Sequence, residues 1–127
     1  MPEIELGVPR GVIESLPEGD ETAERDMRRA IAGIQSRLNE EVGGSDPAEA
    51  ATVVVDAVER MEEQASTYHE FVPELRAWGQ SPIYAIAWRN LYLELIGQLY
   101  EHEGLAGELD RERNFRLVDD GIRLSDL

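Results

Sequence analysis

Two histidines are the side chains of this chain best suited to hold a transition-metal ion. His69 and His102 stand near the ends of two segments with helical periodicity, and antiparallel packing of those segments would place them at opposite ends of a bundle. Neither histidine completes a Glu-x-x-His motif, because Ser66 and Leu99 occupy the positions where the glutamate would stand. We therefore expect no metal site and no metal cofactor.

Paired carboxylates are the next candidates, since inward-facing glutamates on helices can hold magnesium for hydrolysis. Glu59 and Glu62 have a suitable spacing, and Glu94 and Glu101 follow on the next predicted helix. On a helical wheel, however, Glu59 and Glu62 lie on the outward face, and an acid-rich chain contains many such pairs by chance. A metal-dependent hydrolase that uses helix carboxylates is therefore our third hypothesis for the function.

The remaining catalytic patterns are absent from the sequence. There is no cysteine, which excludes disulfides, thiolate catalysis and cysteine metal sites. No Gly-x-Ser-x-Gly elbow, Gly-x-Gly-x-x-Gly loop or Walker loop is present, so nucleophilic serine chemistry and phosphate cradles are not indicated. We predict no catalytic and no cofactor-binding residue, and the sequence favours a non-catalytic role over an enzyme.

Basic residues near the C-terminus raise a different function, because arginines bind nucleic-acid backbones. Asp119-Asp120-Gly121 separates alternating apolar residues and predicts a β-hairpin at about 115–124, so the layout is similar to that of winged-helix domains. Acidic neighbours nearly neutralise the cluster, and helix 82–103 is too apolar to read a groove. A nucleic-acid-associated transcriptional regulator is therefore the alternative function. The arginines concerned are Arg111, Arg113, Arg116 and Arg123.

A helix over residues 82–103 is expected to organise the chain, since three of the four tyrosines lie on it. Its apolar side chains cover well over half of the circumference, more than the single stripe that a surface helix buries. It therefore needs cover on more than one side, from other helices or from another chain. Trp, Tyr and Arg concentrate binding energy at interfaces, so we predict a homodimer through this helix. The predicted interface residues are Tyr84, Trp88, Arg89, Tyr92, Ile96 and Tyr100.

Arg89 departs from the pattern of this helix because it projects among Leu93, Ile96 and Tyr100. Three explanations are open. Its stem lies over apolar surface while its head reaches water, it pairs with a carboxylate from another helix, or it binds an anionic ligand or partner group.

Two further helices are predicted, over about 21–42 and 47–71. Asp20 is a suitable N-cap for the first, and Asp46-Pro47-Ala48-Glu49 has the order of a capping box for the second. Gly33 costs about 1 kcal/mol relative to alanine inside a helix, so it is expected to mark close packing. Arg37 and Glu41 are spaced for an ion pair along the first helix.

The link from Phe71 to Gln80 is expected to leave the second helix. Pro73 suits the start of a short helical turn that ends at Gly79, and Trp78 would then pack its indole onto the edge of the core.

The fold class that these elements indicate is mainly α, a small bundle of three principal helices. Residues 1–19 form an N-terminal arm, in which alternation at Ile4, Leu6 and Val8 predicts a short extended segment. Residues 20–127 form a single helical domain, with the candidate β-hairpin near its end.

The charge of the chain points to its environment. There are 27 acidic residues against 12 basic ones, the net charge is −15, and every basic residue is arginine. This composition resembles that of proteins from extreme halophiles, whose cytoplasm holds molar salt. At that ionic strength the Debye length is about 3 Å, so carboxylate repulsion is screened. We expect the fold to weaken in dilute buffer, which circular dichroism in molar KCl and at ~20 mM salt would measure.

The remaining expectations concern location and partners. No run of 18 apolar residues is present, and the N-terminus lacks the basic-then-apolar order of a secretory signal, so we expect a cytoplasmic protein without membrane contact. The sequence thus predicts a non-catalytic helical interaction module of a halophile that forms a homodimer, with a further protein partner left open and nucleic acid not expected.

Overall fold

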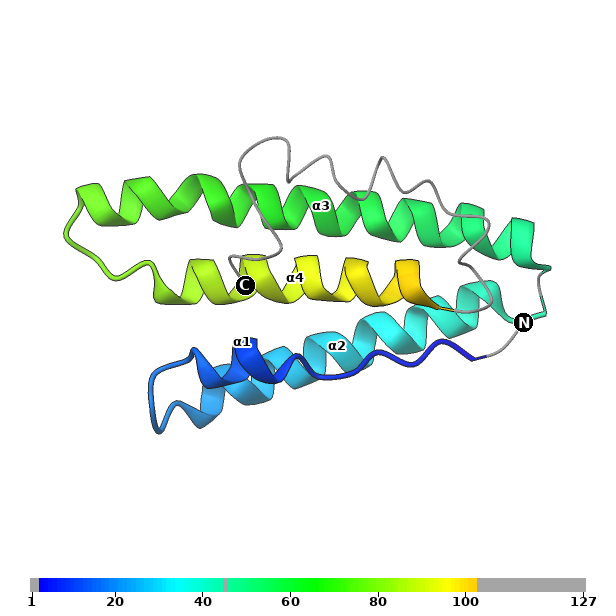
Figure 1. Cartoon of the computed structure of the whole chain (residues 1–127), viewed down its shortest axis with the longest axis horizontal. Helices are drawn as coiled ribbons and strands as arrows, with labels where there is room; N and C mark the ends of the chain where they lie inside the picture. Colours follow the sequence, from blue (N-terminus) through cyan, green and yellow to red (C-terminus); the bar gives the residue numbers. More distant parts are fainter. Residues whose placement is uncertain (1–2, 45, 103–127) are drawn as a thin grey trace.

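The computed structural model describes residues 3–44 and 46–102, and within these ranges the chain is built from helices without a strand (Figure 1). Three long helices confirm the predicted fold class. Helices α3 and α4 form an antiparallel hairpin and share the most extensive contact between two helices. In the view of Figure 1, α4 lies between α3 and α2. The expected β-hairpin at 115–124 lies outside the described residues. The helices are α1 Arg10–Glu14, α2 Glu21–Val42, α3 Pro47–Ala77 and α4 Ile83–Glu101.

The starts of the two longest helices follow from local capping, as the sequence predicts. The side chain of Asp20 accepts a hydrogen bond from the Ala23 amide at 3.0 Å, and that of Asp46 accepts one from Glu49 at 2.9 Å. Each bond satisfies an amide that has no partner within its own helix. Local sequence therefore fixes where α2 and α3 begin.

The end of α3 differs from the prediction. The helix does not stop near Phe71 but continues through Pro73 to Ala77. A proline inside a helix lacks the amide hydrogen bond and crowds the carbonyl four residues back, yet α3 continues past it, with Val72 buried and Leu75 half-buried on one face. The helix ends after Ala77 because Gly79, two residues further on, has a left-handed φ of 73°. The Gly79 amide donates to the Arg76 carbonyl at 3.1 Å, and the Gln80 amide donates to the Leu75 carbonyl at 2.8 Å. These two hydrogen bonds form a Schellman motif.

Helix α4 is the buried centre of the molecule, and the chain itself supplies the cover that its wide apolar surface requires. Helix α3 packs along it, and α1 and the N-terminal arm contact it from another side. The resulting core draws on the arm and on all four described helices. Its fully buried members include Ile4 from the arm, Met27 and Leu38 from α2, Val54 and Val58 from α3, and Leu91, Leu95 and Leu99 from α4.

The N-terminal arm is extended over residues 3–9 and then forms α1 (Figure 1). Ile4 and Leu6 are buried while Glu3 and Glu5 are exposed, as the alternation predicts. No strand pairs with it within the described residues. Side-chain amides satisfy its backbone instead.

Asn39 of α2 makes two of these bonds, accepting from the Ile4 amide at 2.7 Å and donating to the Ile4 carbonyl at 2.8 Å. Gln98 of α4 does the same with Gly7, at 2.7 and 2.9 Å. Leu6 lies between Ile4 and Gly7 in the arm, and its amide donates to the Gln35 side chain of α2 at 2.8 Å. The arm is thereby fastened to both α2 and α4.

Candidate interaction surface

The six residues predicted to form an interface fall into two groups. Ile96 is 2% exposed and Tyr100 is 6% exposed, so both belong to the chain's own core. Trp88, Arg89 and Tyr92 are half-buried, and Tyr84 is exposed. Of the six predicted residues, only the four in the first half of α4 therefore retain side-chain surface for a partner.

Two of the half-buried residues belong to an aromatic cluster that joins α4 to α3. Tyr68 stacks against both Trp88 and Tyr92, with ring centroids 6.3 Å apart in each pair, and Trp88 and Tyr92 lie 6.2 Å from one another. Aromatic pairs at such separations contribute about 0.5–1.5 kcal/mol beyond their burial. Burial, and then the charge of Tyr68, raise the pKa of Tyr92. These rings fasten the hairpin while one edge of the cluster stays exposed.

Arg89 of α4 contacts the imidazole of His69 on α3. Its Nη1 lies 3.1 Å from His69 Nδ1, and its Nε donates to the Asn90 side chain at 3.0 Å. A guanidinium keeps its protons, so the first contact is a hydrogen bond only when Nδ1 is the unprotonated acceptor of the ring. Arg89 is half-buried, and its head thus lies in a polar seam between α3 and α4 rather than only in water.

One carboxylate in this region lies elsewhere than predicted. Glu62 is 2% exposed and does not lie on an outward face, and Glu59 is half-buried. Glu62 stands two helical turns before His69, on the same stripe of α3, and that stripe faces α4. The described ranges contain no group of three or more His, Asp or Glu side chains arranged to hold a metal ion.

The exposed apolar surface is concentrated at one end of the molecule. Among the described residues, four large apolar side chains are exposed, and all of them lie within residues 71–84. This stretch spans the end of α3, the turn and the start of α4, at the left of Figure 1. Trp78, which was expected to pack on the core edge, is 75% exposed because it follows the last turn of α3. We name this surface the turn patch, and its members are Phe71, Trp78, Ile83 and Tyr84.

Tyr84 connects the turn patch to α2. Its hydroxyl donates to the Asp20 carboxylate, which also caps α2. The hydrogen bond from Tyr84 holds the pKa of Asp20 below its ordinary value, and the amide of Ala23 adds to this effect. The same contact with Asp20 raises the pKa of Tyr84. The phenol is therefore held in place although its ring is open to solvent.

The comparison with protein families places the chain. A family model described as a family of unknown function (DUF7971) matches residues 1–126. The chain belongs to DUF7971. No curated protein and no solved structure shows significant similarity to it. In this member of DUF7971, no helix of the described part is long and apolar enough to cross a membrane.

Sequence reasoning missed most of the turn patch in this DUF7971 chain. Phe71 and Trp78 were assigned to the link between two helices, and Ile83 was not singled out. The available signal was Gly79, whose left-handed backbone ends α3 and leaves the preceding indole beyond the helix pair.

Proposed function

We propose that this chain is a non-catalytic helical interaction module that forms a homodimer through the turn patch and the start of α4. The observation that carries the proposal is the gathering of all exposed large apolar side chains of the described residues within 71–84. Large apolar side chains that are exposed together in one region mark association sites on soluble proteins. The acidic composition supports a cytoplasm with molar salt as the setting.

The energetics favour the turn patch over the rest of α4. Burying the exposed part of the Trp78 indole is worth on the order of 3 kcal/mol, from the area of a tryptophan side chain and the usual coefficient for apolar burial. Trp and Tyr are the residue types that dominate binding energy at protein interfaces. A two-fold axis through the patch brings the same residues of two copies together, which gives a closed dimer.

The test is solution mass by light scattering in molar KCl, for the wild type and for Trp78→Asp. We expect a dimer for the wild type and a monomer for the variant, because the substitution places a charge in the patch without touching the core. Ala32→Asp on the exposed face of α2 is the control and should remain dimeric. A wild type that is monomeric at every concentration, or a variant that stays dimeric, contradicts the proposal. Absorbance at 260 nm in the same runs tests the nucleic-acid alternative.

A further inference from the structure

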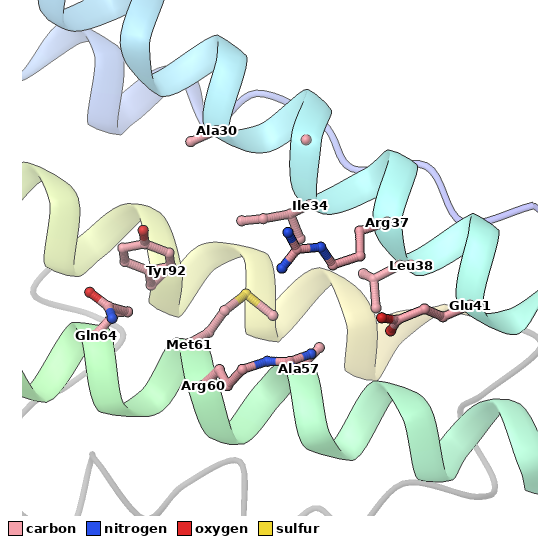
Figure 2. A pocket seen from close by; sticks show the side chains of 11 residues that line it. Ala30, Ile34, Arg37, Leu38, Glu41, Ala57, Arg60, Met61, Gln64 and Tyr92 are labelled. Carbon is pink, nitrogen blue, oxygen red and sulfur yellow. The ribbon is translucent and has the colours of Figure 1, made fainter.

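An open groove runs between α2 and α3, on the side of the bundle away from the arm. It has a volume of about 490 Å³. Figure 2 looks into it, with α2 above, α3 below and α4 behind. Its base is apolar and consists of Ile34 and Leu38 from α2, Met61 from α3 and Tyr92 from α4. This size and lining are typical of sites for small molecules.

Two arginines border the groove from opposite sides. The Arg37 side chain extends from α2 toward α3, and Arg60 lies along the α3 edge (Figure 2). Neither has a hydrogen bond or an ion pair with any residue in the described ranges. The ion pair that the sequence predicts between Arg37 and Glu41 is not formed, although Glu41 also lines the groove. In a chain with 27 acidic residues and 12 arginines, a groove lined by two guanidinium groups and the single carboxylate of Glu41 is locally net positive.

The wall of the groove contains a glycine that the fold does not require. Gly33 lies in the middle of α2, where glycine costs about 1 kcal/mol relative to alanine. A Cβ atom at this position would meet nothing within 4 Å, so the close packing expected of Gly33 does not occur within the described chain. Ala30 on the same wall and Ala57 on the opposite wall, formed by α3, are also small. The missing side chains leave room for a group that the chain does not supply.

We propose that this groove binds a small amphipathic carboxylate. The carboxylate head accepts hydrogen bonds from Arg37 and Arg60, whose planar guanidinium groups match its geometry. The apolar body lies along Gly33 and covers Met61 and Tyr92. A second copy docked groove to groove would bury four guanidinium groups, two from each copy, against only the two Glu41 carboxylates of these grooves, so the excess positive charge disfavours this occupant. The inference concerns a different surface from the turn patch and does not depend on self-association.

The first experiment titrates the full chain with decanoate in molar KCl, below the micelle concentration, and follows backbone amide shifts by NMR. We expect saturable shifts at residues 30–41 and 57–64, on the two walls. Decyltrimethylammonium carries a similar tail with a cationic head, and decanol carries it with a neutral one. Both should bind at least about tenfold more weakly, since charge-assisted hydrogen bonds are lost. Equal affinity for the three probes, or no saturable shift with decanoate, would overturn the proposal.

Variants of the chain then test the binding of the carboxylate head and of the apolar body separately. Arg37→Gln combined with Arg60→Gln should weaken decanoate binding at least about tenfold, while Arg29→Gln, on the exposed side of α2, should leave it unchanged. Gly33→Leu fills the groove and should abolish binding, whereas Ala32→Leu at the next, exposed position should not. Circular dichroism checks that each variant is folded.

Two further outcomes decide between occupants. Trp78→Asp should bind decanoate as the wild type does, which keeps this test apart from that of the dimer. A change in solution mass on Gly33→Leu would identify the groove as a protein interface and would overturn the ligand proposal.

Discussion

The two flanks of α2 make opposite use of polar side chains. On the flank toward the N-terminal arm, Asn39 and Gln35 bind the backbone of Ile4 and Leu6, so the arm covers this flank. On the flank toward α3, Arg37 borders an open groove and has no partner within the described chain. The two flanks therefore differ in whether their polar side chains find hydrogen-bond partners within the described chain.

The chemistry of the side chains explains the difference. An amide both donates and accepts, so Asn39 can pair with the N–H and the C=O of one residue, as it does with Ile4. A guanidinium only donates, so Arg37 cannot satisfy a backbone amide and is suited to an anion. The closed flank is thus built to hold the chain's own backbone, and the open flank is not.

The largest expected effect tests whether the closed flank carries more stability. Ile4 is fully buried, and Ile4→Ala should lower the free energy of unfolding by about 2–5 kcal/mol. Ile34→Ala is the matched change on the open flank and should cost clearly less, because its side chain is half-buried beside the groove and leaves no closed cavity. Urea unfolding in molar KCl measures both values. Equal losses would show that the arm contributes no more than the groove wall.

The next effect isolates the hydrogen bonds from apolar burial. Asn39→Ala leaves the Ile4 amide and carbonyl without their partner and should cost about 1–3 kcal/mol. Arg37→Ala, half a turn away on the other flank, should stay within about 0.5 kcal/mol of the wild type. Hydrogen exchange at the Ile4 amide should accelerate in the first variant alone. An unchanged exchange rate would mean that burial, and not Asn39, protects this amide.

Much of the fold follows from signals that act over a few residues. Asp20 and Asp46 fix the helix starts, and the apolar arc of residues 82–103 identifies the central helix. The positions that could not be predicted depend on distant partners. Asn39 meets a residue 35 positions away and Gln98 one 91 positions away, and no local spacing encodes such pairings.

The candidate site shows the same limit. Helical spacing correctly groups Trp88 and Tyr92 on one side of α4, but it cannot divide the arc between core and surface, so Tyr100 was placed in an interface that it is too deeply buried to reach. A wheel drawn for one helix also cannot show that the stripe with Glu62 faces α4. The only sequence signal for the groove is Gly33, which lowers the stability of α2 and leaves open space beside it, in the groove.

The smallest expected effect concerns Tyr84, which tethers the start of α4 to the start of α2 through Asp20. The folded pKa of Asp20 is lowered, so its contribution to stability is present above about pH 4, the ordinary range of an aspartate, and is lost as the pH falls through the folded pKa. The folded pKa of Tyr84 is raised, so its contribution is present below about pH 10 and is lost as the pH rises through the folded value.

The stability difference between the wild type and Tyr84→Phe should therefore be constant from about pH 5 to 9 and should shrink on acidification below about pH 4. Asp20→Asn, which keeps a capping side chain but removes the charge, should abolish this pH dependence. Both groups are exposed, so molar salt and water keep the effect below those of Ile4 and Asn39. A difference that grows on acidification would mean that the phenol does not depend on the charged carboxylate, and the two helix starts would then be held by packing alone.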